Sequence, residues 1–345
     1  MTKVLKYLLL PFSLMYWVAV SLRNFFYSVG IFKSHKIALK SICVGNLSAG
    51  GTGKTPMTLF LAEHFSKTRQ IAILSRGYGR NSSGFIKIER GTAAEIAGDE
   101  SAMYAKRNLG NTHVFVCEKR AYGVKKIITL YPSTDLILLD DALQHRAVTA
   151  GFTLILTDYH KPFYADLPLP AGRLRESKSG KNRADAIVVT KCPNALSVDE
   201  KQQIEQKINT PKIPIYFASI AYSTPVCVGK EFEFSSVKRV LLVTAIADAT
   251  SLIAHFNGAF EVIHLSFPDH HPYTDNDLFK VHQKFDTFAS DETAIVTTEK
   301  DLVKLADLST EATMKNYPWF YQPITVSIDR KDEFLEQLNN YVDTI

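Results

Sequence analysis

A glycine-rich loop between an expected strand and an expected helix constrains the fold of this chain more than any other feature. The loop, GNLSAGGTGKTP, occupies residues 45–56. Before it, KIALKSICVG at 36–45 changes from alternating to continuously apolar, which predicts a strand entering a core. After it, a helical pattern runs from about Thr55 to Ser66, and Pro56 is tolerated because N–H groups in a first helical turn have no partner within the helix. This order of strand, glycine loop and helix predicts a phosphate-binding loop.

The loop matches most of the P-loop pattern G-x-x-x-x-G-K-[ST]. Gly53, Lys54 and Thr55 fit it, but Ser48 stands where the pattern begins with glycine. The remaining glycines still allow left-handed turns that direct several backbone N–H groups at one phosphate. We expect Lys54 to contact the β- and γ-phosphates and Thr55 to bind Mg²⁺. The predicted nucleotide site comprises Ser48, Ala49, Gly50, Gly51, Thr52, Gly53, Lys54 and Thr55.

The nucleotide is expected to be ATP. Guanine-specific P-loop enzymes carry N-K-x-D after a late strand, and the nearest run here, TKCP at 190–193, lacks both the Asn and the Asp. In a related group of P-loop proteins, a lysine just before the double glycine acts across a dimer interface. This chain has Ala49 at that position, which disfavours membership of that group.

Short apolar strands alternate with helical patterns along most of the chain, which predicts a parallel sheet covered on both faces. The strands expected first lie at 70–75, 112–117, 134–140, 152–157 and 184–190, with a helix at 119–130. A second alternation has strands at 237–246, 260–267 and 293–298, and helices near 248–256, 275–289, 299–307 and 331–342.

We therefore predict an α/β fold with two domains, as the length of 345 residues also favours. A P-loop NTPase-like domain with a parallel sheet is expected at 36–220, a linker at 221–236 and a smaller α/β domain at 237–345. A net charge of +5 gives no reason to expect a nucleic-acid partner. The four cysteines contain no C-x-x-C pair, which indicates reduced thiols of a cytosolic chain and no zinc site.

Residues 1–35 form a separate predicted unit. The run YLLLPFSLMYWVAVSL at 7–22 is almost wholly apolar, with Lys3 and Lys6 before it and Arg23 after it. It is shorter than the roughly 20 apolar residues that cross a bilayer, and it contains a proline. We favour a helix lying in the membrane surface, with its apolar side in lipid and its cations at anionic headgroups. A core helix and a cleaved signal are the alternatives.

Carboxylates stand at two places suited to phosphoryl-transfer chemistry. LILLDDALQH at 136–145 ends a buried strand with Asp140 and Asp141, which is the Walker-B position for a Mg²⁺ ligand. The two side chains point to opposite sides, and the pattern leaves open which one contacts the metal; helix capping is the alternative. In AGDESAMYA at 97–105, Asp99 and Glu100 begin a helix, where a dipole role and a chemical role are equally compatible with the spacing.

A histidine pair and three basic motifs complete the candidate site. SFPDHHPYT at 266–274 offers His270 and His271 for catalysis or substrate orientation, with a structural loop role and a metal site as alternatives. The motifs SRGYGR at 75–80, CEKRAYG at 117–123 and LPAGRLRE at 169–176 each follow an expected strand. Arginines there suit a phosphorylated acceptor or transition-state charge, although a solvated surface is the alternative for each.

Together these motifs resemble the tetraacyldisaccharide 4'-kinases, also called lipid A 4'-kinases. The resemblance rests on GNLSAGGTGKTP, SRGYGR, GDE, DDALQH, LPAGRLRE, FPDHH and TEKD, in that order along nearly the whole chain. The sequence departs from the family in DDALQH, where an aromatic residue more usually precedes Gln144, and at Arg173.

The resemblance implies ATP-dependent phosphorylation of the 4'-hydroxyl of a tetraacylated glucosamine disaccharide 1-phosphate at the cytoplasmic face of the bacterial inner membrane. It implies two α/β domains with a cleft between them, a leading helix that touches the membrane, and Asp99 and His270 as the acid/base pair beside Lys54. The partners are then the lipid substrate and the membrane surface, and no protein partner is required. The predicted substrate residues are Arg80, Glu100, Arg120, Gln144, His145, Arg173 and Arg175. The competing hypothesis is a P-loop regulatory ATPase that acts on a protein partner and has no acid/base pair.

Overall fold

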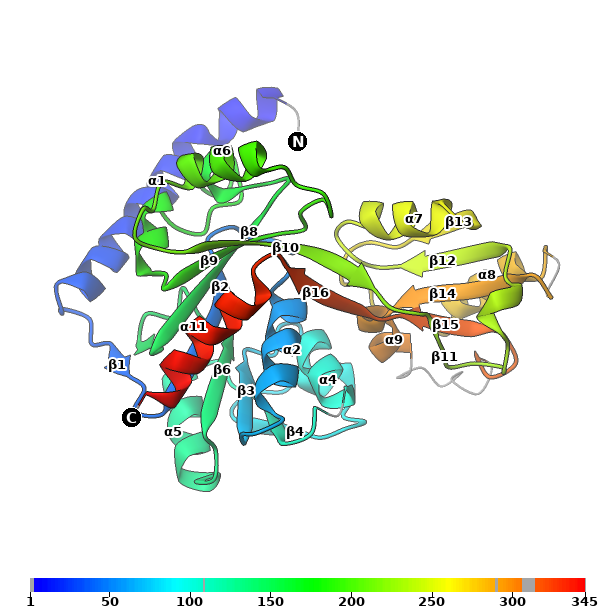
Figure 1. Cartoon of the computed structure of the whole chain (residues 1–345), viewed down its shortest axis with the longest axis horizontal. Helices are drawn as coiled ribbons and strands as arrows, with labels where there is room; N and C mark the ends of the chain where they lie inside the picture. Colours follow the sequence, from blue (N-terminus) through cyan, green and yellow to red (C-terminus); the bar gives the residue numbers. More distant parts are fainter. Residues whose placement is uncertain (1–2, 108, 289–290, 306–313, 345) are drawn as a thin grey trace.

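Two large sheets lie side by side in the described part of the chain (Figure 1). The computed structural model describes residues 3–107, 109–288, 291–305 and 314–344. Within these residues the strands form a nine-stranded sheet, a five-stranded sheet and a small pair of β1 (His35–Lys36) with β7 (Val148–Thr149). The α/β architecture with parallel strands that the sequence predicts is confirmed.

The larger sheet carries the phosphate loop near its centre. In spatial order it comprises β16 (Ile324–Ile328), β10 (Ile215–Tyr222), β9 (Ala186–Thr190), β8 (Phe152–Asp158), β2 (Lys40–Asn46), β6 (Leu136–Asp140), β3 (Ile71–Ser75), β5 (Thr112–Val116) and β4 (Ile86–Ile88). Its inner strands are parallel, while β16 and β4 are antiparallel to their neighbours at the edges. The strands expected from the apolar runs are confirmed, although the strand before the loop begins at Lys40 and not at 36.

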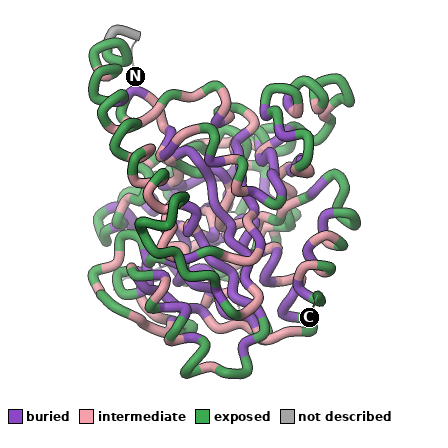
Figure 2. The backbone as a smooth tube through the Cα atoms, turned by 90° about the vertical axis from the view of Figure 1, so that its left-hand side faces the viewer, coloured by how far each residue is buried: buried purple, intermediate pink, exposed green. Residues whose placement is uncertain are grey.

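Both faces of this sheet are buried, as parallel strands require. Successive residues of β2 show the alternation, because Ile42 and Val44 belong to one core cluster and Cys43 to the other. The first cluster is covered by α2 (Lys54–Phe65) and α11 (Lys331–Asp343), and the second by α5 (Arg120–Leu130) and α6 (Val198–Ile208). In Figure 2 the buried strands accordingly run through the middle of the molecule, with exposed turns around them. Two short helices, α3 (Ala94–Ala97) and α4 (Asp99–Lys106), also contribute to the first cluster.

The smaller sheet has its own core around Trp319 and Phe256. Its strands, in spatial order, are β11 (Val226–Cys227), β15 (Trp319–Gln322), β14 (Thr293–Thr298), β12 (Arg239–Thr244) and β13 (Glu261–Ser266). The helices described beside it are α7 (Thr250–Asn257), α8 (Asp275–Phe285) and α9 (Glu299–Leu305). The ends expected for two of these helices, at 289 and 307, lie outside the described residues.

The predicted domain limits need two corrections. The expected linker at 221–236 contributes β11 to the smaller sheet, and Phe234 packs on Phe320 there. The end of the expected second domain returns to the first, because β16 pairs with β10 and Phe334 of α11 lies in the first core (Figure 1). The alternation of strand and helix does not reveal which sheet a strand joins, and β16 covers an edge that β10 would otherwise expose.

The leading helix, α1 (Lys3–Ser28), is longer than the apolar run that predicted it. By length and composition, Leu5–Ser28 could cross a membrane, so the expectation that the run is too short does not hold for the helix. Only 6% of its apolar window is buried, which contradicts the core-helix alternative. It lies along the outer edge of the first domain (Figure 1) and exposes large apolar side chains such as Phe12 and Met15.

Candidate active site

The phosphate loop connects β2 to α2 and has an open backbone. Gly50 and Gly53 have φ values of 105° and 81°, in the left-handed region that favours glycine. Among the described residues, a Cβ added at Gly50 or Gly51 would meet no atom within 4 Å, so a ligand can approach the backbone there. The loop therefore has the local geometry of a phosphate site.

Asn46, the last residue of β2, holds the backbone of this loop through its side chain. Its side chain is fully buried and donates to the Ser48 carbonyl at 2.6 Å and the Thr52 hydroxyl at 2.7 Å. Its Oδ1 accepts hydrogen bonds from Lys54 Nζ at 3.3 Å and from the Arg175 guanidinium. The sequence motif contains Asn46, but sequence reasoning gave it no role.

The two Walker-B aspartates have different surroundings, which separates their roles. Asp141, at φ 49°, accepts two hydrogen bonds from Arg175 at 2.7 and 3.0 Å and lies 3.7 Å from Lys54 Nζ. Burial would raise the pKa of Asp141, but Lys54 and Arg175 lower it to about 2. Asp141 is therefore an anion that orients Lys54 of the loop and Arg175 beside it.

Asp140 is buried and only partly satisfied. Its Oδ2 accepts from the Tyr104 hydroxyl at 3.0 Å, while Oδ1 has no partner among the described residues. Burial, reinforced by the charge of Asp141, raises the pKa of Asp140 to about 6. An unpaired buried carboxylate oxygen beside the loop fits a Mg²⁺ ligand. The Tyr104 hydroxyl also interacts with Thr55, so the two predicted ligands share a neighbour.

The described residues contain no group of three or more His, Cys, Asp or Glu side chains suited to a metal. Mg²⁺ does not require such a group, because it usually keeps several waters and takes one or two protein carboxylates plus substrate phosphates.

Asp99 and His270 meet across the boundary between the two domains. His270 Nδ1 lies 3.0 Å from Asp99 Oδ2, and Lys304 Nζ lies 3.0 Å from the same oxygen. Burial would raise the pKa of Asp99, but the His270 hydrogen bond and Lys304 lower it. Asp99 follows Gly98, at which a Cβ would lie 2.8 Å from the Tyr78 carbonyl oxygen, so only glycine fits before it.

A second ion pair joins the domains next to this contact. Lys300 Nζ lies 3.3 Å from Glu100 Oε1 and 3.2 Å from His270 Nε2. His271 faces away: its Nε2 lies 3.0 Å from Asp277 Oδ2, in the capping box of α8, and its ring stacks on Phe267. The two histidines therefore do not share one metal.

Two predicted substrate arginines are occupied elsewhere in this structure. The Arg80 side chain is 2% exposed, pairs with Glu118 and donates to the Gly84 carbonyl at 2.7 Å. Arg120 is equally buried and donates to the carbonyls of Cys117 at 2.6 Å and Asp140 at 3.1 Å. In this structure Arg80 thus secures a loop and Arg120 supports the Walker-B strand end, and their contacts with the substrate stay predictions.

The other predicted substrate residues lie around the loop. Arg173 pairs with Asp166 at 2.9 Å, and Gln144 donates to the Asn46 carbonyl at 2.8 Å. Burial lowers the pKa of His145 to about 4, and nearby arginines contribute, so its ring is neutral at pH 7.

Sequence reasoning missed Tyr104, Lys304, Lys300 and the buried Glu176. Tyr104 lies four residues after Glu100, and Lys304 four after Lys300, so each pair shares one face of its helix. That spacing was the signal available in the sequence. Glu176 and Lys300 lie inside motifs that sequence reasoning quoted without assigning these residues.

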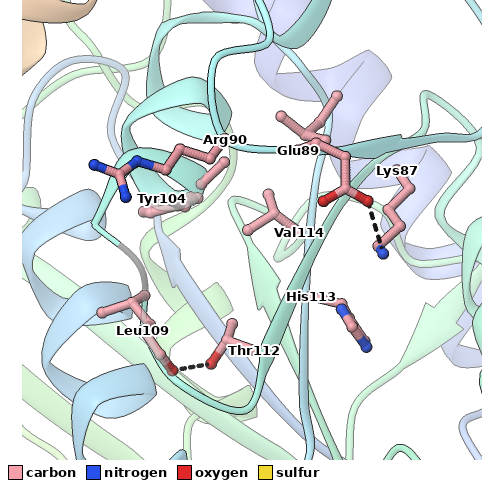
Figure 3. A pocket seen from close by; sticks show the side chains of 10 residues that line it. Lys87, Glu89, Arg90, Tyr104, Leu109, Thr112, His113 and Val114 are labelled. Atoms are coloured by element: carbon pink, nitrogen blue, oxygen red, sulfur yellow. Dashed lines mark hydrogen bonds and ion pairs between the residues drawn. The ribbon is translucent and has the colours of Figure 1, made fainter.

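A cavity of about 120 Å³ lies on the far side of α4, between this helix and strands β4 and β5 (Figure 3). It includes the ion pair of Lys87 with Glu89 at 2.7 Å. None of the site residues predicted from the sequence lines it, but Tyr104, which donates to Asp140, does, so the cavity adjoins the candidate site at this side chain.

Comparisons with known proteins agree with the motifs. A family model described as Tetraacyldisaccharide-1-P 4'-kinase matches residues 5–343. A tetraacyldisaccharide 4'-kinase from Cytophaga hutchinsonii is 39% identical over 344 residues, covering 99% of this chain and 95% of that protein. One from Flavobacterium psychrophilum is 37% identical, covering 97% and 96%. The crystal structure of LpxK from Aquifex aeolicus in complex with ATP is similar with a TM-score of 0.75 and 27% identity, covering 98% of this chain and 99% of that one.

Proposed function

The chain belongs to the tetraacyldisaccharide-1-P 4'-kinase family, and from that premise we propose how its own residues transfer the phosphoryl group. The reaction moves the γ-phosphoryl group of ATP to the 4'-hydroxyl of a tetraacyldisaccharide 1-phosphate in lipid A biosynthesis. The regulatory ATPase hypothesis is not favoured, because named kinases match the chain over nearly its full length.

ATP binds with its phosphates on the loop backbone and on Lys54. The ATP complex of the similar Aquifex aeolicus structure supports this placement. Lys54 lies between Asn46 and Asp141, which orient its ammonium group before the nucleotide arrives. Such preorganised charge is the main means of catalysis in phosphoryl transfer.

Thr55 and Asp140 would bind Mg²⁺, with Asp140 Oδ1 as the protein carboxylate oxygen. When bound there, the ion neutralises negative charge on the β- and γ-phosphates. Asp141 is assigned the task of orienting Lys54 and Arg175, because two hydrogen bonds from Arg175 already occupy its oxygens.

Asp99 takes the proton of the sugar hydroxyl, and His270 and Lys304 orient it. Both partners contact Oδ2, which leaves Oδ1 for the hydroxyl group. The lowered pKa keeps Asp99 ionised at neutral pH. A loose transition state needs little basicity from this group, so position matters more than a high pKa.

The exposed apolar surface of α1 lies in the membrane surface. Phe12, Leu14 and Met15 are 61–71% exposed, which is unusual for such side chains unless they contact lipid or a partner. With α1 in the headgroup region, the acyl chains of the substrate stay in the bilayer while its sugars reach the site. The use of ATP supports the cytoplasmic side for this membrane surface.

The observation that carries this proposal is the 3.0 Å contact of Asp99 with His270 from the other domain. The test is transfer of label from γ-labelled ATP to tetraacyldisaccharide 1-phosphate, followed by thin-layer chromatography, with Asp99→Asn as the matched control. The wild-type protein should label the lipid and the variant should not. Release of labelled phosphate without lipid labelling would favour the regulatory ATPase.

A further inference from the structure

We propose that residues 169–176, here called the strap, couple the seating of α1 on the first domain to the shape of the phosphate loop. Nucleotide affinity then depends on side chains of α1, a helix outside the nucleotide site. The proposal rests on the proposed function only in taking the loop as the ATP site.

One side of the strap pairs with the backbone that leads into the phosphate loop. The Ala49 N–H donates to the Arg173 carbonyl at 2.6 Å, and Leu174 forms an antiparallel bridge with Ser48. The Arg175 N–H donates to the Leu47 carbonyl at 2.8 Å. A displacement of the strap would therefore move the first residues of the loop.

The other side of the strap carries α1. The Ser13 hydroxyl accepts from the Ala171 N–H at 2.9 Å, and the Tyr16 hydroxyl donates to the Arg175 carbonyl at 2.9 Å. Further along the helix, Asn24 Nδ2 donates to Glu176 Oε2 at 3.1 Å. Spacings of three and eight residues place these three side chains on one face of a helix with 3.6 residues per turn.

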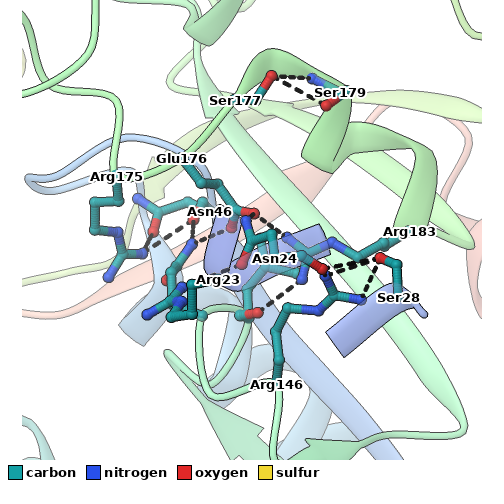
Figure 4. Close-up of polar contacts among 12 residues, drawn as sticks. Arg23, Asn24, Ser28, Asn46, Arg146, Arg175, Glu176, Ser177, Ser179 and Arg183 are labelled. Atoms are coloured by element: carbon teal, nitrogen blue, oxygen red, sulfur yellow. Dashed lines mark hydrogen bonds and ion pairs between the residues drawn. The ribbon is translucent and has the colours of Figure 1, made fainter. Parts of the chain in front are cut away.

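Glu176 connects the two sides through its carboxylate (Figure 4). The side chain is 3% exposed and accepts from Gln144 Nε2 at 2.8 Å and from Arg183 at 2.5 Å. Gln144 Nε2 also donates to the Asn46 carbonyl at 2.8 Å. The contacts thus run without a gap from Asn24 through Glu176 and Gln144 to Asn46, whose side chain positions the loop.

The position of α1 allows its contacts with the strap to affect the free energy of nucleotide binding. Most of the helix surface is exposed, so few polar contacts determine how the helix sits on the domain. If the loop is better ordered when α1 is seated, nucleotide binding and helix seating stabilise each other by the same factor. Buried polar networks of this kind also lose much of their geometry when one member is removed.

The test measures binding of a non-hydrolysable ATP analogue with Mg²⁺ to the full chain in detergent, without lipid substrate. The double variant Tyr16→Phe with Asn24→Ala should bind the analogue about fivefold more weakly. Tyr7→Phe, the same chemical change at a 72% exposed position of the same helix, should bind like the wild type. Equal affinities for the double variant and the wild type would overturn the proposal.

Hydrogen exchange of α1 with and without the analogue is the reciprocal measurement, and it distinguishes lost coupling from a folding defect. In the wild type, the analogue should slow hydrogen exchange along α1, and in the double variant this protection should shrink. Glu176→Gln, which keeps the shape of the side chain and removes its charge, should weaken analogue binding in the same direction while circular dichroism stays unchanged. Wild-type binding without protection of α1 overturns the coupling alone. A wild type that does not bind the analogue overturns the proposed function as well.

Discussion

The phosphate loop and the Asp99–His270 contact are two parts of one site, yet they are built in opposite ways. The supports of the loop come from one domain, and Asn46, which holds the loop backbone, is fully buried. The Asp99–His270 contact joins two domains, and the His270 side chain is 36% exposed. Folding of the first domain alone thus orders the phosphate loop, whereas the Asp99–His270 contact depends on the relative position of the two domains.

The seam between the domains is an ion-pair contact between two helices. At its near end are the contacts of Asp99 and Glu100 on α4 with Lys304 and Lys300 on α9. At its far end Arg107 donates twice to Glu299, at 2.6 and 2.7 Å. We therefore expect substitutions in the phosphate loop to weaken ATP binding and to lower kcat. Substitutions at the seam should lower mainly kcat.

The largest effect is expected at the loop. Lys54→Ala should lower transfer by about 10³- to 10⁵-fold, because one charge that stabilises the transferring phosphoryl group is lost. Steady-state kinetics measures the loss, and unchanged circular dichroism shows that the fold remains. Retained turnover would contradict the assignment of the loop.

At the seam, Asp99→Ala should lower kcat by about 10²- to 10⁴-fold while the KM for ATP changes little. The reason is that Asp99 contacts groups of the other domain and not the phosphate loop. Kinetics at saturating lipid measures the split. A large rise in the KM for ATP would break the distinction between the two regions.

The two neighbouring histidines provide a matched comparison. His270→Ala should lower kcat by about 10²-fold, since Asp99 loses its orienting partner. His271→Ala should leave kcat close to normal and lower the melting temperature, because His271 contacts the Asp277 cap of α8. The reverse pattern would move the catalytic role to His271.

A smaller effect is expected at the far end of the seam. Arg107→Met should lower kcat about 3- to 10-fold with the KM for ATP unchanged, because α9 loses its fixed position on α4. Glu299→Gln should lower kcat to a similar extent. The double variant Arg107→Met with Glu299→Gln should lower kcat no more than either single change. Glu63→Gln is the control, since Glu63 pairs with the same arginine from within the first domain. Equal effects of all three changes would show that Arg107 acts only on stability.

A change in stability, and not in catalytic rate, is expected at Asp140. Its pKa is raised to about 6, so the unfolded chain loses this proton first, and the nucleotide-free fold is penalised as pH rises from about 4 through 6. Asp140→Asn should therefore stabilise the nucleotide-free protein at pH 8 by about 2–3 kcal/mol, one pKa unit being about 1.4 kcal/mol, and should have no such effect at pH 3. Denaturant unfolding at both pH values measures the difference. Stabilisation at pH 3 as well would contradict the assigned cause.

Sequence reasoning located the elements and the motifs because both are local. The apolar runs gave the strands that flank the loop, and glycine, lysine and threonine at fixed spacing gave the loop itself. It did not foresee that Arg80 and Arg120 donate to backbone carbonyls of their own chain, because an arginine after a strand looks the same in sequence whether it faces a substrate or a buried carbonyl. It could not assign Asn46, whose task appears only when the loop folds back over it.

By itself the sequence determined the α/β class, the phosphate loop and the order of motifs that identifies the family, since residues close together in the chain specify all three. Only the tertiary structure separated Asp140 from Asp141 and returned β16 and α11 to the first domain. It also gave the 3.0 Å contact between His270 and Asp99, which the family resemblance implied only as a pairing of roles. The physical reason is that burial, ion pairing and strand partnership depend on distance in space, and Asp99 and His270 are 171 residues apart in the chain.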